Sequence, residues 1–122
     1  MKAFLVVSHG SRNPKAAREI EDLTGRLRKK SGAEAVEAAY LEINSPDIPE
    51  GISKCVNQGA TEVILLLNFL NAGNHVLEDV PALVEAARKR YPGVKFVLTP
   101  HLGANKKTDD IFLDLIAQAE SN

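Results

Sequence analysis

Cysteine is nearly absent from this sequence. Cys55 is the one cysteine among 122 residues, so no disulfide can form within the chain and the disulfide framework of small secreted domains is excluded. Long apolar runs are also missing, because the longest, Val63–Leu67, is far shorter than the roughly 20 residues of a membrane-spanning helix. Since the chain starts without the apolar stretch and cleavage site of a signal peptide, we expect it in the cytoplasm and not in a membrane.

The sequence also lacks an excess of charge of either sign. It has 15 basic and 16 acidic residues and a formal net charge of −1, so we expect neither nucleic acid nor an anionic membrane as a partner. The glycine patterns of dinucleotide and nucleoside triphosphate sites, G-x-G-x-x-G and G-x-x-x-x-G-K-[ST], are absent as well. An acidic ligand must therefore be held by local basic groups.

What is present is the pattern of one globular α/β domain. The hydrophobic fraction of 44% and the charged fraction of 25% are ordinary for such a domain, and the length suits a single domain over residues 1–122. Four short apolar segments alternate with four segments of helical period, which predicts a β-α repeat. The strands are expected at Ala3–Val7, Ala35–Leu41, Glu62–Leu67 and Val94–Thr99.

The composition of these four segments predicts their order in the sheet. Ala3–Val7 and Glu62–Leu67 are almost continuously apolar, as strands covered on both faces are. The other two segments are diluted by alanine or charged residues and are expected at the edges. With short, right-handed connections, this predicts a parallel sheet of order 2-1-3-4 between two helical layers, a three-layer α/β sandwich.

Start signals and apolar stripes predict the helices. Asn13 and Pro14 indicate an N-cap and a first helical residue, and Ser45 with Pro46 gives the same signal for the second helix, although Pro49 leaves its first residue open. Each apolar stripe is expected to face the sheet. The stripes are Ala16, Ile20, Leu23 and Leu27; Ile48, Ile52, Cys55 and Val56; Val80, Leu83, Val84 and Ala87; and Ile111, Phe112, Leu115 and Ile116.

Two histidines and a carboxylate follow the strands at one edge of the predicted sheet. Ligands bind such sheets beyond the carboxyl ends of the strands, at the point where the winding reverses, here between the first and third strands. His9 follows the first strand, His75 lies in the loop after the third, and Glu42 follows the second. Imidazole nitrogen with carboxylate oxygen suits first-row divalent metals such as cobalt, nickel, iron and zinc. The sequence therefore predicts a site that can bind and transfer such a metal.

Each of these residues also has a structural interpretation. A histidine at a strand end can cap loop carbonyls, and Glu42 can pair with a helix terminus. Arg12, Lys106 and Lys107 lie near the same edge, where they can meet a polyanionic ligand or remain ordinary solvated charges. His101 follows the outer fourth strand, so we expect it at the rim or in a structural role, outside the metal set.

Three stretches, taken in order, resemble a known family: the short, CbiX-type sirohydrochlorin cobaltochelatases of the class II tetrapyrrole chelatases. The stretches are residues 6–12, residues 39–42 with Pro46 and Ile48 following, and residues 69–76 leading into residues 78–81. The resemblance covers nearly the whole chain and implies a flavodoxin-like half of a chelatase. It departs at Asn68, where proline is usual, at Asn74, where a basic residue is common, and at Asn105, where histidine is often found.

The resemblance implies an activity and a site. The activity is insertion of Co²⁺ into sirohydrochlorin in anaerobic cobalamin biosynthesis, with no permanently bound cofactor. His9 and His75 would be the principal metal ligands, and Glu42 a further ligand or proton acceptor. Sirohydrochlorin carries carboxylate side chains, which polar loop groups would orient. The expected substrate contacts are Ser11, Arg12, Ser45, Asn71, Ala72, Gly73 and Asn74. Because the short form is similar to one half of longer, two-domain chelatases, a homodimer is also implied.

Alternatives stay open. Iron or nickel can replace cobalt as the inserted metal, and a module that binds metal or tetrapyrrole without turnover would use the same residues. Phosphoryl transfer through His9 is a further hypothesis, because histidine phosphatases also have a histidine followed by glycine after the first strand. Those enzymes are expected to carry arginine immediately before that histidine, a position that Ser8 occupies here.

Overall fold

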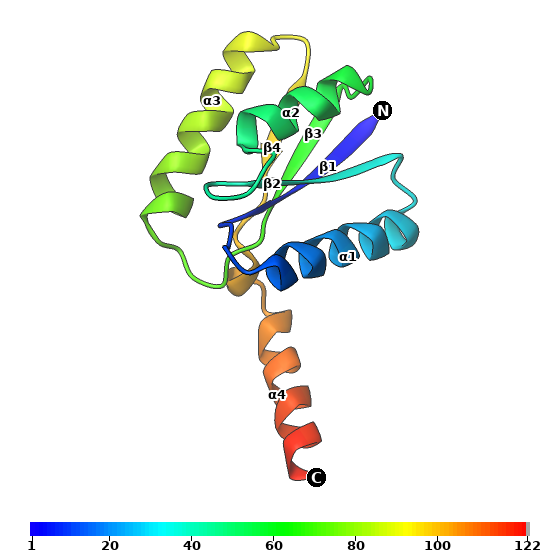
Figure 1. Ribbon diagram of the computed structural model, residues 1–122, viewed down its shortest axis with the longest axis vertical. Helices are drawn as coiled ribbons and strands as arrows, with labels where there is room; N and C mark the ends of the chain where they lie inside the picture. The colour runs from blue at the N-terminus through cyan, green and yellow to red at the C-terminus, as the bar shows by residue number, and fades with distance from the viewer. Residues whose placement is uncertain (122) are drawn as a thin grey trace.

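The structure, a computed structural model, describes residues 1–121, and the side chains of His75 and Leu77 lie outside that description. Strands and helices alternate along the chain (Figure 1). They are β1 (Lys2–Ser8), α1 (Pro14–Ser31), β2 (Ala35–Tyr40), α2 (Ile48–Asn57), β3 (Glu62–Leu67), α3 (Val80–Arg90), β4 (Lys95–Leu98) and α4 (Lys107–Glu120). A π-helical turn, η1 (His75–Asp79), precedes α3, and a 3₁₀ turn, η2 (Leu102–Ala104), precedes α4.

The sheet has the predicted architecture. All strand pairs are parallel and the order is β2-β1-β3-β4, which confirms both the α/β class and the assignment of inner and outer strands. In this register Ser8 lies opposite Tyr40, and Val7 lies opposite Leu67. The carboxyl ends of β1, β2 and β3 therefore finish side by side, and the loops that follow them share one edge.

One face of the sheet carries the main hydrophobic core under α2 and α3. Leu5 and Leu65 of the sheet and Ile52 of α2 are at most 1% exposed, and the Cys55 thiol is fully buried among them, as its stripe position predicts. Each such side chain contributes about 1.5–3 kcal/mol by leaving water. The core holds the inner strands rigidly and so fixes the loops at their ends.

The helix starts were predicted with mixed success. Asn13 caps α1 as expected, with its side-chain oxygen accepting from the Lys15 amide at 3.0 Å. The prediction that Ser45 and Pro46 open the second helix is wrong, because α2 begins at Ile48 behind Asp47, which forms a capping box with Glu50. The chain still lies beside β2 at Pro46, whose carbonyl accepts from the Tyr40 amide at 2.9 Å.

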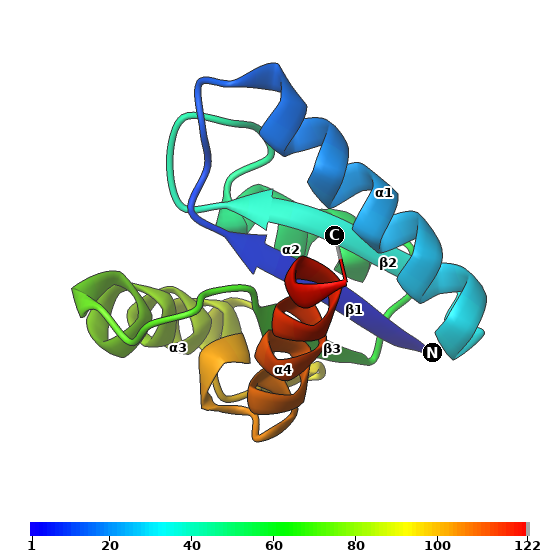
Figure 2. The same cartoon turned by 90° about the horizontal axis from the view of Figure 1, so that it is seen from below.

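The other face of the sheet is covered by α1 only in part. The prediction that the last helix buries Ile111, Phe112, Leu115 and Ile116 is wrong, since these side chains are 50–59% exposed. Figures 1 and 2 show α4 extending away from the sheet, with the carboxyl terminus at its far end. An apolar stripe predicts that a helix buries one face, and it does not say against which surface. None of the helices described within residues 1–121 has the length and apolar content needed to cross a membrane.

Candidate metal centre

His9 and Glu42 meet at the carboxyl edge of the sheet, directly after β1 and β2. The Nε2 atom of His9 lies 2.5 Å from Oε1 of Glu42. Both side chains remain open to solvent, with 49% of the His9 side chain and 53% of the Glu42 side chain exposed. The structure thus brings together two of the three residues predicted for the metal set, at a place that an ion or a flat ligand can reach.

Backbone contacts hold this pair in place. The Leu41 amide donates to the Ser8 carbonyl at 3.0 Å, and the Glu42 amide donates to the His9 carbonyl at 3.1 Å, so the β1–β2 ladder continues past the strand ends. Gly10 makes this approach possible. Its φ is +108°, and a Cβ there would lie 1.9 Å from the Glu42 carbonyl oxygen. No other residue type fits at this position without moving Glu42 away from His9.

The turn after Glu42 is tight and strained. Ile43 has a φ of +72°, and the Asn44 amide donates to the Glu42 carbonyl at 2.8 Å, as in the rare γ-turn with positive φ. The side chain of Asn44 then accepts from the Ser11 amide at 2.6 Å, which ties this turn to the loop after β1. Sequence analysis missed Asn44, because an asparagine in a polar loop carries no signal of its partner.

A second side-chain contact joins the ends of β1 and β3. The Asn68 side-chain amide donates to the buried Ser8 hydroxyl oxygen at 3.0 Å, and the Asn68 backbone amide donates to the Val7 carbonyl at 2.9 Å. Sequence analysis noted Asn68 only as a departure from the family pattern. In this chain it fixes the start of the loop that leads to His75.

His75 is the third predicted ligand, and its side chain lies outside the described residues. Its backbone begins η1, at the end of the loop that leaves β3 from the same sheet edge as the His9 loop. Among the side chains that the structure describes, no three His, Cys, Asp or Glu residues form a group able to hold a metal ion. His9 and Glu42 supply two donors, and the role of His75 stays a prediction.

The residues predicted to contact the substrate differ in their exposure to solvent. Arg12, Ser45 and the loop residues 71–74 are exposed near this edge, available to a ligand. Ser11 is half-buried, and its hydroxyl oxygen accepts from the Asn13 amide at 3.1 Å, so it also supports the start of α1.

Tyr40, the last residue of β2, is the nearest buried ionisable group before the Glu42 turn. Burial, and to a smaller extent the negative charge of Glu21, raises the pKa of its phenol above the usual value of 10.0. The phenol therefore stays protonated at neutral pH and does not act as a base there.

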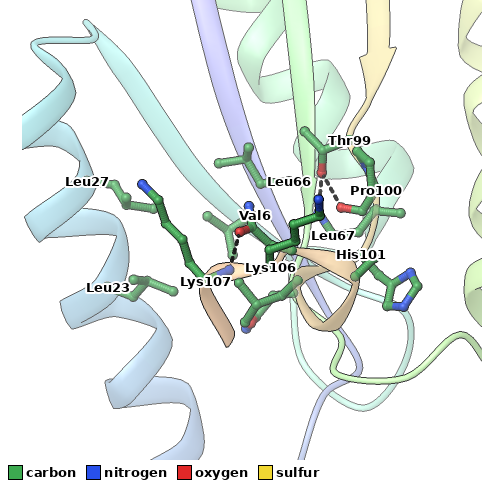
Figure 3. Close-up of a pocket in the computed structure, with 14 residues that line it drawn as sticks. Val6, Leu23, Leu27, Leu66, Leu67, Thr99, Pro100, His101, Lys106 and Lys107 are labelled. Atoms are coloured by element: carbon green, nitrogen blue, oxygen red, sulfur yellow. Dashed lines mark hydrogen bonds between the residues drawn. The ribbon is translucent and has the colours of Figure 1, made fainter. Parts of the chain in front are cut away.

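An apolar groove lies on the sheet face beside α1. Figure 3 shows Leu23 and Leu27 of α1 on one side and His101 on the other. Lys106 and Lys107 also line this groove. His101 lies opposite α1 across this groove, and its exclusion from the metal set stays a prediction. The groove, which we call the α1 groove, is lined by Val6, Leu23, Leu27, Leu66, Leu67, Asn68, Thr99, Pro100, His101, Leu102, Ala104, Asn105, Lys106 and Lys107.

Comparison with known proteins identifies the family. The sequence model of the family CbiX matches residues 3–119. The chain belongs to the CbiX family. It is 32% identical over 119 residues to the chloroplastic sirohydrochlorin ferrochelatase of Arabidopsis thaliana, which covers 98% of this chain and 53% of the plant protein. It is 29% identical over 122 residues to the sirohydrochlorin cobaltochelatase of Priestia megaterium, which covers 100% of this chain and 40% of that protein. The chain thus spans about half the length of these curated relatives.

Solved structures agree with this assignment. A CbiX protein from Marinobacter aquaeolei, described as a putative cobalamin biosynthesis protein, superposes with a TM-score of 0.84 at 23% identity, covering 99% of this chain and 96% of its own, which shows the fold. The sirohydrochlorin chelatase SirB of Bacillus subtilis subspecies spizizenii, solved in complex with cobalt, superposes with a TM-score of 0.79 at 30% identity, covering 87% of this chain and 45% of SirB. The CbiX chain therefore corresponds in size to about one half of SirB.

Proposed function

We propose that this CbiX-family chain is a sirohydrochlorin chelatase that inserts a divalent metal, with Co²⁺ as the preferred ion. The observation that carries the proposal is the solvent-open His9–Glu42 pair, 2.5 Å apart at the carboxyl edge of the sheet. The names of the relatives support the substrate class, because they are sirohydrochlorin ferrochelatases and cobaltochelatases. The choice of metal is the more specific part of the proposal, since relatives named as iron chelatases and as cobalt chelatases are about equally similar to this chain.

The chemistry of insertion needs a base and weakly held ligands. A free tetrapyrrole carries two pyrrole N–H protons, which must leave as the metal enters. The hydrogen bond between His9 and Glu42 places a proton between Nε2 and Oε1, and an ion bound to both atoms would replace that proton. In the proposal His75 completes the set, and the remaining coordination positions are left to water and to the macrocycle nitrogens.

Substrate orientation is assigned to polar groups around the pair. The carboxylates of sirohydrochlorin would meet Arg12, the hydroxyls of Ser11 and Ser45, and the exposed loop of residues 71–74. The exposed side chain of Ile43 stands beside Glu42, where it can contact the apolar surface of the macrocycle. No permanently bound cofactor is needed for this reaction, because the metal is a substrate.

Comparison of metals in one assay tests this proposal. Purified protein is mixed with sirohydrochlorin and equal free concentrations of Co²⁺, Ni²⁺ or Fe²⁺ without oxygen, and the change in absorbance is followed. We expect each accepted metal to be inserted faster than in the absence of protein, and Co²⁺ fastest. Faster insertion of Fe²⁺ or Ni²⁺ than of Co²⁺ would show that the preferred metal is not cobalt. Insertion of no metal above the uncatalysed rate would overturn the proposal, and stoichiometric binding without product would indicate a binding module instead.

A further inference from the structure

Asn44 joins the two loops that carry His9 and Glu42. Its side-chain oxygen accepts from the Ser11 amide at 2.6 Å, and its own amide donates to the Glu42 carbonyl at 2.8 Å. Asn44 lies two residues after Glu42, and Ser11 lies two residues after His9. The side-chain bond therefore connects equivalent points of the two loops, just beyond the two predicted metal donors.

The two loops need such a connection because they separate at this point. The ladder between β1 and β2 continues up to the bond from the Glu42 amide to the His9 carbonyl, at 3.1 Å. Beyond that bond one loop enters α1, on one face of the sheet, and the other leads to α2, on the opposite face. The bond between Asn44 and Ser11 links the loops just as they begin to diverge.

The turn between Glu42 and Asn44 needs support because its backbone is strained. Ile43 has a φ of +72°, which β-branched residues rarely adopt, and such a conformation persists only where the surroundings hold it. The ladder holds one end of the turn, and the Asn44 side chain holds the other. Without the Asn44 bond, Ile43 can relax to a negative φ, and the direction in which the Glu42 side chain leaves the backbone changes with it.

The two donor side chains depend on this backbone for their positions. About half of each is exposed, 49% for His9 and 53% for Glu42, so packing restrains them only in part. Their separation therefore follows the separation of the two loops. The Cβ position of Gly10 lies 1.9 Å from the Glu42 carbonyl oxygen and 3.3 Å from Oδ1 of Asn44, so the Asn44 side chain belongs to the same close contact between the loops.

We propose that Asn44 is a positioning residue for metal binding: its side chain holds the Glu42 turn against the His9 loop and so keeps both donors within reach of one ion. This role rests on the proposed function, in which the divalent metal is a substrate. Asn44 acts through the backbone and does not itself bind the ion. Removal of groups that orient metal ligands typically lowers metal affinity or activity by about 10- to 100-fold.

Calorimetric titration of the metal-free chain with Co²⁺, without sirohydrochlorin, tests this role. The binding that His9→Ala removes is assigned to the site, and Asn44→Ala should raise its dissociation constant by about 10-fold or more. Asn13→Ala is the matched control, because it also removes an asparagine oxygen that accepts from a backbone amide, that of Lys15 at 3.0 Å. It should lose stability in urea titrations and keep its Co²⁺ affinity. An unchanged dissociation constant for Asn44→Ala, or an equal rise for Asn13→Ala, would overturn the inference.

A rescue variant separates the hydrogen bond from other effects of the substitution. Asn44→Asp keeps an oxygen that can accept from the Ser11 amide, so it should restore most of the Co²⁺ affinity. Because it also adds a negative charge, Asn44→Ala combined with Ser45→Asp supplies a charge without the acceptor and should not restore the affinity. Restoration by this double variant would show that charge, and not position, sets the affinity.

Exchange of the Ser11 amide proton, followed by NMR without metal, reports on the bond itself. It should be slow in the unmodified chain and in Asn44→Asp, and faster in Asn44→Ala. Equally slow exchange in Asn44→Ala would show that Asn44 does not hold the His9 loop, and the inference would be wrong.

The same variants distinguish this role from the proposed function. A chain that binds Co²⁺ through His9 but inserts it into no tetrapyrrole would refute the proposed function, and a weaker affinity of Asn44→Ala would still support the positioning role. Normal insertion and normal Co²⁺ affinity in Asn44→Ala would refute only the positioning role. If the unmodified chain binds no Co²⁺, both are wrong.

Discussion

At the scale of single residues, Gly10 lies too close to the Glu42 carbonyl to carry a side chain. Gly10→Ala places a Cβ 1.9 Å from that oxygen at a φ of +108°, so the loops after β1 and β2 must separate. We expect the free energy of unfolding to fall by about 1–3 kcal/mol in urea titrations. Gly73→Ala is the matched control, because nothing lies within 4 Å of its Cβ position. Equal stabilities of the two variants would contradict the assigned role of Gly10.

Ile43 is the other strained residue beside the pair. A β-branched residue at a φ of +72° is rare, whereas asparagine adopts such values readily. Ile43→Asn should therefore raise the free energy of unfolding by about 1 kcal/mol. Leu70→Asn removes an equally exposed apolar side chain with no positive φ and should give no gain. Destabilisation by Ile43→Asn beyond that of Leu70→Asn would show that the turn is not strained.

Ile43→Asn also tests whether strain serves binding. If the exposed Ile43 side chain contacts the macrocycle, the variant should bind sirohydrochlorin more weakly while it unfolds less readily, as expected where strain is kept for function. Fluorescence titration with sirohydrochlorin measures this. Unchanged affinity would remove Ile43 from the substrate contacts.

At the scale of elements, the burial of the Cys55 thiol shows that α2 packs closely against the sheet. Burial in particular raises the pKa of the Cys55 thiol from its ordinary value of 9.0 to about 11, with a smaller contribution from the charge of Glu37. The thiol is therefore protonated and inaccessible near neutral pH. Ellman's reagent should label it only as fast as the protein opens. Rapid labelling in native buffer would show that α2 does not stay packed.

The same shift predicts a pH dependence of stability. Between about pH 9 and pH 11 the unfolded chain loses the thiol proton while the folded chain keeps it, so the free energy of unfolding should fall as the pH rises through this window. Cys55→Ala should lose less stability over the same window than the unmodified chain. Parallel slopes for the two proteins would contradict the raised pKa.

The elements also show which features the sequence could predict. The apolar content of β1 and β3 placed them inside the sheet, because a strand covered on both faces leaves little room for charge. The convergence of His9 and Glu42 followed from parallel strands ending at one edge. The start of α2 could not be predicted from Ser45 and Pro46, because the contact of Pro46 with Tyr40 depends on where β2 ends.

Side-chain contacts between distant loops were also beyond sequence reasoning. Asn44 and Asn68 bond to Ser11 and Ser8, 33 and 60 residues away, and no local pattern encodes such partners. These contacts depend on the strand register, which brings the loop after β1 between the loops after β2 and β3. The meeting of His9 and Glu42 at this edge was thus predictable, whereas the groups that position them were not.

At the scale of the whole molecule, α4 is the element whose packing was predicted wrongly. The apolar stripe of α4 was recognised correctly, but its burial was assigned to the chain's own sheet, from which the structure shows it standing away. Sequence periodicity identifies the apolar face of a helix, but it does not identify the surface that this face contacts.

The two faces of the sheet are covered differently. The core under α2 and α3 fixes the sheet edge that carries His9 and Glu42, while the opposite face is covered by α1 only in part and carries the α1 groove. The Gly103 amide of η2 donates to the Phe69 carbonyl, so η2 contacts the loop that leads to His75.

The most direct test is the initial rate of Co²⁺ insertion into sirohydrochlorin by His9→Ala, measured beside the unmodified chain. Because His9 would both hold the ion and share a proton with Glu42, the variant should lose about 100-fold or more of the rate above background. His101→Ala, which changes a histidine outside the metal set, should keep the rate of the unmodified chain. Full activity of His9→Ala, or equal losses in both variants, would contradict the account.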